Sequence, residues 1–273
     1  MPRVQMRISY HYGDAEEGRL DLYDASVSLQ GLARALAITT HALANEGEIR
    51  KQGDRARGVD IYVSPSRRGS FVEVVTIVFS NQVAQTIGAS VLAAATWDLL
   101  KWSWSKTVDK EYRPSTPTVR RLEERKEPFI GEIEDALEVP LERFHRPIKK
   151  NEDVQISVRR PRGEEVLRLD QDTLASVSLQ YDDNISRDIK ANVTRYNILS
   201  GFGRFYVDDR ESTVSFKLAD DVPALQKELL TWSMDQANRG NEGKIRFDAT
   251  TVMSARGDIK RYIVHEIRRD EQR

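Results

Sequence analysis

Basic and aromatic side chains alternate with apolar ones along three predicted strands in the last third of the chain. Successive side chains of a strand point to opposite faces of a sheet, so residues two apart share a face. Small barrels bind single strands by stacking bases on aromatic side chains beside a basic groove. We therefore expect a site for a single-stranded oligonucleotide or a nucleotide, formed by Arg195, Arg204, Tyr206 and Lys217.

An ordinary solvated barrel surface explains the same residues. About half of the aromatic residues in this region must fill the core of a barrel, and residues 189–273 carry 15 basic against 13 acidic side chains. That balance does not amount to a polybasic surface. Both interpretations stay open at the level of the sequence.

No arrangement of residues predicts catalysis. The histidines have no second His or Cys at metal-ligand spacing, and the paired aspartates at 182–183 and 208–209 are typical of turns. The sequence 201–203 (GFG) lacks the Lys-Ser/Thr of a phosphate loop, so a hairpin turn is the better interpretation. We expect no enzyme activity, no metal and no cofactor. The four histidines without ligand spacing are His11, His41, His145 and His265.

One stretch lacks charge in a chain that is otherwise 31% charged: the 24 residues between Glu73 and Asp98. Its first part suits a buried strand, and Val83–Trp104 predicts a helix. In one interpretation this is the buried core helix of a soluble domain. In the other, Val83–Leu100 enters a bilayer, with tryptophans at the headgroups and small residues at helix contacts. The residues assigned to this helix are Gly88, Ser90, Ala94, Trp97 and Trp102.

Composition narrows the class of protein. The 273 residues include no cysteine, which fits a reducing compartment, and the first ten lack the apolar core of a signal peptide. The net charge of −1 argues against general binding to polyanions. We expect a cytoplasmic or inner-membrane location and room for two domains.

The N-terminal region predicts strands at Val4–Tyr12 and Arg19–Tyr23 and then a helix capped by Asp24. Two more strands follow at Val59–Ser64 and Ser70–Phe79. The region is thus a ββαββ domain. The proline-containing, charged residues 106–128 read as a linker, and an amphipathic helix follows at residues 129–144.

A second, β-rich domain is expected to begin near Val154. A hairpin and a short helix come first, and five strands with one helix follow, which is the element order of a small barrel of the OB or SH3 type. The hairpin strands are 154–159 and 165–169, the barrel strands are 191–199, 202–207, 213–218, 244–253 and 259–267, and the helix is 223–238.

Three short stretches carry a resemblance to a family of bacterial and prophage proteins: Leu20–Asp24 (LDLYD), Ser28–Gly31 (SLQG) and Arg68–Glu73 (RGSFVE). In that family such motifs precede a hydrophobic segment ending like Trp97–Lys101 (WDLLK), and a β-rich domain follows. The motifs look structural, so no catalytic residue carries over. The resemblance implies a role in phage defence or mobile elements. The layout is also similar to Hailong-type defence effectors, in which an oligonucleotide restrains a membrane channel.

The expected protein is α+β, with an N-terminal domain (1–80), a central hydrophobic helix (81–105), a linker with an amphipathic helix (106–150) and a barrel domain (151–273). The expected function is that of a non-enzymatic anti-phage effector that forms homo-oligomers and acts at the membrane under control of a nucleotide or oligonucleotide. The alternative is a soluble oligomeric nucleic-acid-binding or scaffold protein. The ligand, its sign of action and the oligomer order do not follow from the sequence.

Overall fold

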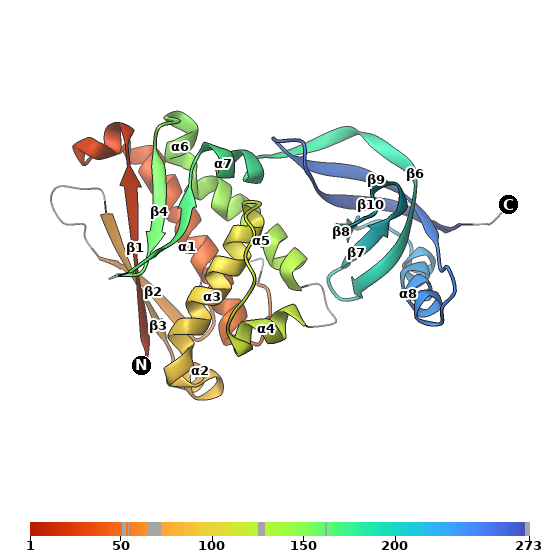
Figure 1. Cartoon of the computed structure of the whole chain (residues 1–273), viewed down its shortest axis with the longest axis horizontal. Helices are drawn as coiled ribbons and strands as arrows, with labels where there is room; N and C mark the ends of the chain where they lie inside the picture. The colour runs from red at the N-terminus through yellow and green to blue at the C-terminus, as the bar shows by residue number, and fades with distance from the viewer. Residues whose placement is uncertain (51–52, 54, 65–71, 125–128, 162, 271–273) are drawn as a thin grey trace. The chain divides into compact units, whose positions relative to one another are not determined.

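The computed structural model describes residues 1–50, 53, 55–64, 72–124, 129–161 and 163–270. These form two compact units (Figure 1). Of the described residues, the first unit comprises those within Met1–Glu124 and Glu132–Ser178, and the second comprises residues 179–270 with residues 129–131.

The first unit is built on an antiparallel sheet with strand order β2-β3-β1-β4-β5. Along β1 the side chains alternate between buried and exposed, so one face of the sheet forms a core. Helices α1 and α3 lie on that face (Figure 1). The strands are β1 (Arg3–His11), β2 (Val59–Ser64), β3 (Val72–Phe79), β4 (Gln155–Arg159) and β5 (Glu165–Leu169).

Two expectations about this sheet are wrong. Arg19–Tyr23 is not a strand, because a 3-10 turn at Gly13–Glu17 leads into helix α1 (Leu22–Ala44). The N-terminal elements therefore follow the order β1, α1, β2, β3, in place of the expected ββαββ. The hairpin of β4 and β5, expected in a second domain, instead extends this sheet because β4 pairs with β1.

The start of α1 explains the LDLYD stretch. Asp21, not Asp24, caps the helix, since its carboxylate accepts hydrogen bonds from the backbone N–H groups of Tyr23 and Asp24. Asp24 is buried and accepts a hydrogen bond from Arg146 at 2.8 Å. This ion pair fastens α1 to α6 (Arg146–Lys150).

The uncharged stretch forms two helices, α2 (Asn81–Ile87) and α3 (Ala89–Thr107). Gly88 joins them with φ +96°, a conformation that favours glycine. Among the described residues no single helix has both the length and the apolar character to cross a membrane; α2 and α3 meet that test only together, across a bend of 86°. The single central hydrophobic helix is thus not confirmed.

The segment after α3 is bound to the fold, whereas a linker was expected. Asp98 in α3 is 4% exposed, and its carboxylate accepts hydrogen bonds from Tyr112, Ser115 and Thr116, the shortest at 2.6 Å from the Thr116 hydroxyl. Helix α4 (Pro117–Glu123) begins directly after these residues. The buried carboxylate therefore holds a loop against the helix.

Helix α5 (Phe129–Phe144) matches the predicted amphipathic helix and contains Pro140. Where it crosses α1, a Cβ on Gly31 would lie 2.5 Å from the backbone oxygen of Pro140 and the backbone nitrogen of Phe144. The Ser28 hydroxyl bonds the Phe144 carbonyl at 2.7 Å. The SLQG stretch is thus the contact that lets two helices approach closely. Helix α7 (Gln171–Val177) completes the unit.

The second unit is a closed five-stranded barrel with strand order β10-β8-β7-β6-β9, in which β9 also pairs with β10. Neighbouring strands are antiparallel except β8 and β10, which are parallel. The predicted barrel and its helix are confirmed. The elements are β6 (Leu179–Asn197), β7 (Phe202–Val207), β8 (Ser212–Leu218), α8 (Ala224–Asn238), β9 (Ile245–Ser254) and β10 (Ile259–Arg269).

Aromatic rings fill the barrel. Phe205 stacks on Phe216 and on Phe247, with ring centroids 3.9 and 4.4 Å apart, and Phe247 meets Tyr262 edge-on. A Cβ on Gly203 would lie 2.3 Å from the Phe216 ring, so the strand position opposite this ring must be glycine. Gly201, with φ +68°, lies in the hairpin turn that the GFG stretch predicted.

Candidate functional site

The four predicted ligand residues lie on one outer face of the barrel. Arg195 on β6 pairs directly with Arg204 on β7, and Tyr206 is two positions further along β7. Lys217 on β8 is two positions from Ser215, the partner of Arg204. Because their strand neighbours point inward to the stacked phenylalanines, these four residues lie on the outer side of the barrel, called here the β6–β8 face. Between Arg204 and Lys217 this face is covered, since Phe202 and Ser215 are buried against Gly131.

The β6–β8 face combines positive charge with one accessible aromatic ring. Tyr206 is 39% exposed, while Arg195, Arg204 and Lys217 are half-buried. The other ring on this outer side, Phe202, is fully buried. Tyr206 is therefore the ring on this face that could stack on a base, with Arg195 and Arg204 nearby and Lys217 farther along the face.

The Arg195–Arg204 pair is unusual for a sheet. Directly opposed residues of an antiparallel pair have Cβ atoms about 4.5–5.5 Å apart, and like charges there are destabilising. A cluster of cations that costs stability is typical of a surface that receives an anion. Guanidinium groups in particular bind phosphate through two parallel hydrogen bonds.

Apolar side chains border the β6–β8 face at the turn between β6 and β7. Ile198 is 73% and Leu199 96% exposed. The turn is joined to β8, since the Leu218 N–H donates to the Gly201 carbonyl at 2.9 Å. These side chains thus extend the surface beyond Lys217 with an apolar edge.

Other basic residues of the barrel are neutralised within it. Arg246 forms an ion pair with Asp270 at 2.6 Å and another with Asp188, and Lys190 reaches Asp270 at 2.7 Å. Hydrogen bonds from Lys190 and Arg246 lower the pKa of Asp270. Arg268 also pairs with Asp188. This network joins the ends of β6, β9 and β10, away from the β6–β8 face.

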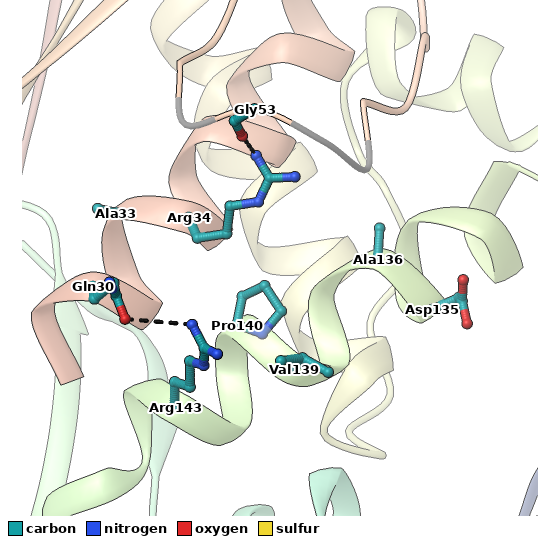
Figure 2. Close-up of a pocket in the computed structure, with 9 residues that line it drawn as sticks. All are labelled: Gln30, Ala33, Arg34, Gly53, Asp135, Ala136, Val139, Pro140 and Arg143. Carbon is teal, nitrogen blue, oxygen red and sulfur yellow. Dashed lines mark hydrogen bonds between the residues drawn. The ribbon is translucent and has the colours of Figure 1, made fainter. Parts of the chain in front are cut away.

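A pocket that the sequence did not indicate lies between α1 and α5 of the first unit (Figure 2). Its volume is about 570 Å³. Arg34 donates to the Gly53 carbonyl, and Arg143 reaches the Gln30 side chain at 3.3 Å across the opening. The lining residues are Gln30, Ala33, Arg34, Gly53, Asp135, Ala136, Val139, Pro140 and Arg143.

The pocket's charges oppose one another, because Asp135 lines it together with two arginines. Ala33 on α1 and Pro140 on α5 also line it, so part of its wall is apolar (Figure 2). This mixture does not select one chemical class of ligand. The only sequence signal near it was the SLQG stretch, whose Gln30 and Gly31 mark the crossing of α1 and α5.

The histidines are separated and hydrogen-bonded locally. Burial lowers the pKa of His145 to about 4, and its ring bonds the Leu141 carbonyl and the Thr173 hydroxyl. His41 accepts from the Arg57 N–H, and His265 bonds Thr250. Within the described ranges no group of three or more His, Cys, Asp or Glu residues could hold a metal ion.

The residues assigned to a membrane or oligomer helix separate into two sets. Ser90 and Ala94 are exposed beside the Gly88 bend, on a corner without charged residues. Trp97 and Trp102 are 6% and 5% exposed, and the Arg160 guanidinium lies 5.6 Å from the centroid of the Trp97 ring. The tryptophans are therefore core residues of the first unit, as the interpretation of a buried core helix predicts, and do not occupy the interfacial position of the membrane interpretation.

Fold and surface together define a two-unit α+β protein that joins a helix-covered antiparallel sheet to a closed barrel with a cationic face. Residues 6–178 match a domain of unknown function (DUF7946), and the chain belongs to this family. Residues 186–268 match a second family of unknown function (DUF7947). The curated proteins and the solved structures contain no significant match to this chain.

Proposed function

We propose that this protein is a non-enzymatic binding protein whose barrel holds a short single-stranded oligonucleotide or a nucleotide on the β6–β8 face. The observation that carries the proposal is the direct pairing of Arg195 with Arg204 beside the exposed ring of Tyr206. The two guanidinium groups suit a phosphate, and the ring suits a base.

The topology supports the choice of ligand. The strands follow the order 1-2-3-5-4 around the barrel, the third and fifth are parallel, and the helix joins the third to the fourth. This arrangement favours the OB type over the SH3 type. OB barrels bind oligonucleotides and oligosaccharides on the face of their second and third strands, which are β7 and β8 here.

The test is a titration of the whole chain with fluorescent single-stranded DNA and RNA of about ten nucleotides, a length within the 4–16 that one OB fold holds, and with cyclic nucleotides. We expect binding that weakens as salt rises. Arg204→Gln should weaken it, while Arg239→Gln, an exposed arginine paired with Asp235 on α8, should not. Absence of binding at low salt would reject the proposal.

A second candidate is an oligomeric anti-phage effector that acts at the membrane under control of that ligand. The observation in its favour is the helix pair α2 and α3, which together have the length and composition of a membrane span although they are bent. In this candidate the ligand controls whether the pair leaves the first unit. Recovery in the membrane fraction with or without oligonucleotide would support it. Exclusive recovery in the aqueous fraction under both conditions would reject it.

A further inference from the structure

The sheet of the first unit has an open face that carries arginines. On β1, Val4, Met6 and Ile8 are buried toward the helices, and the alternate residues Arg3 and Arg7 are exposed on the other side. The partners of this outer row on β4 are Ser157 and Arg159. Arg3 and Arg7 therefore do not contribute to the core between the sheet and the helices.

Arg7 lies directly opposite Arg159 across the antiparallel pair of β1 and β4. Opposed like charges destabilise a sheet. Glu165 offsets part of this charge, since it accepts from Arg159 at 3.1 Å, but it also binds Arg168 at 2.9 Å. Arg159 and Arg168 thus share one carboxylate, which forms no ion pair with Arg7.

Hydrogen-bonding capacity remains unused there. Within the described part of the chain, Arg7 makes no ion pair or hydrogen bond, and the buried Nε of Arg159 has no acceptor. A buried donor without a partner requires an explanation, and a bound anion or water supplies one.

The next row of the face carries neutral polar groups. The His11 ring and the Ser157 hydroxyl are 2.8 Å apart. Burial lowers the pKa of His11, the charges of Arg159 and Arg168 lower it further, and Glu165 acts in the opposite sense. At neutral pH the histidine is therefore uncharged, and the positive charge of the site comes from the arginines.

We infer that the open face of this sheet binds a phosphate group between Arg7 and Arg159, bordered by His11 and Ser157. The guanidinium fork matches the oxygens of phosphate, and a bound anion removes the repulsion between the two arginines. The phosphate is either free or part of a single-stranded nucleic acid. The inference concerns the first unit alone and does not rest on ligand binding by the barrel.

The test measures thermal unfolding of the whole chain at pH 7, in chloride and in phosphate of equal ionic strength. In chloride, Arg7→Gln should melt about 1–3 °C above the wild type, because one of two opposed charges is gone. Phosphate should raise the melting temperature of the wild type more than that of Arg7→Gln. Arg3→Gln is the matched control, since Arg3 lies on the same strand and face but opposite Val78, and it should keep the full response.

Two results of this experiment would overturn the inference. Equal rises in wild type and Arg7→Gln would mean that phosphate acts only by its general exclusion from protein surfaces, and would overturn the inference. A variant that melts below the wild type in chloride would also overturn it. A second arm replaces phosphate with micromolar oligothymidylate: a rise that Arg7→Gln abolishes and Arg204→Gln retains assigns the phosphate to a nucleic acid on this face, whereas a response to inorganic phosphate alone assigns a free anion.

Discussion

The indole N–H of Trp104 donates a hydrogen bond to the Thr39 hydroxyl at 2.9 Å, and both residues are buried. The bond joins helix α3 to helix α1. The Trp104 ring also meets Phe144 edge-on, with centroids 6.2 Å apart. For α3 to enter a bilayer, these contacts must break, so any insertion requires the first unit to open.

Asp98→Asn should destabilise the first unit by roughly 1–3 kcal/mol, because an amide group would face the N–H groups of Ser115 and Thr116. Chemical denaturation at pH 7 measures the loss. Asp153→Asn, at an exposed position of the first unit, should change stability little. Equal stability of Asp98→Asn and the wild type would show that the loop is not held by this carboxylate.

The same carboxylate predicts a pH dependence. Burial alone would raise the pKa of Asp98, but hydrogen bonds from Thr116, Ser115 and Tyr112 lower it below 3.8. The pKa of Asp98 is lower in the folded than in the unfolded protein. Its charge therefore stabilises the fold fully above the unfolded pKa, and this stabilisation disappears as the pH falls through the folded pKa. The difference in the free energy of unfolding between the wild type and Asp98→Asn should therefore be smaller at pH 2.5 than at pH 7. The decrease measures what the charge of Asp98 contributes to stability.

Gly31→Ala should destabilise the protein, although alanine stabilises most helices by about 1 kcal/mol relative to glycine. The reason is the 2.5 Å approach of a Cβ to the backbone of α5. We expect a loss of roughly 1–3 kcal/mol from overpacking, measured by thermal unfolding. Gln30→Ala, at the exposed neighbouring position, is the control. A more stable Gly31→Ala would contradict the close crossing.

Sequence pattern predicted much of the fold: alternation identifies β1, and a run rich in Val, Ile and Phe identifies β3. It failed where the decisive contact is distant in sequence. Nothing near Val154 indicates that β4 pairs with β1, since that contact joins residues about 150 positions apart. It also failed at Gly88, because the apolar pattern continues through the bend.

The candidate sites divide in the same way. Alternation places Arg204, Tyr206 and Lys217 on one face, so the β6–β8 face was predictable from the sequence. Opposition of Arg7 and Arg159 was not, because it depends on the register between strands from two distant segments. The sequence did not predict the interaction of Asp98 with the following loop either, because the polar and proline residues of that loop are also typical of a linker.

The exposed corner at the α2–α3 bend predicts self-association. Ser90 and Ala94 present small, uncharged side chains there, next to Gly88. If this corner joins copies of the chain, Ala94→Arg should shift the protein toward monomer in light scattering. Gly88→Leu should do the same, with added strain from its positive φ. Gln82→Arg, exposed at the start of α2, is a control for added charge. A wild-type protein that is monomeric in buffer and in detergent would end this hypothesis.

The last prediction separates stacking from charge on the β6–β8 face. Base stacking contributes about 1–3 kcal/mol per base, so Tyr206→Ala should weaken oligonucleotide binding by roughly ten- to a hundredfold. This loss should be similar at low and high salt, because no counterion is involved. Tyr206→Phe retains the ring and should bind nearly as well as the wild type, which distinguishes stacking from a hydrogen bond of the hydroxyl.

Lys217→Gln should act differently. Removing one phosphate contact should reduce the salt dependence of log K by about 0.7–0.9, the value per contact, so its effect fades as salt rises. Titrations of the whole chain at 50 and 200 mM salt measure both slopes. If Tyr206→Ala and Lys217→Gln lose affinity with the same salt dependence, the ring and the cation do not play separate roles. If neither variant loses affinity, the oligonucleotide binds elsewhere on the chain.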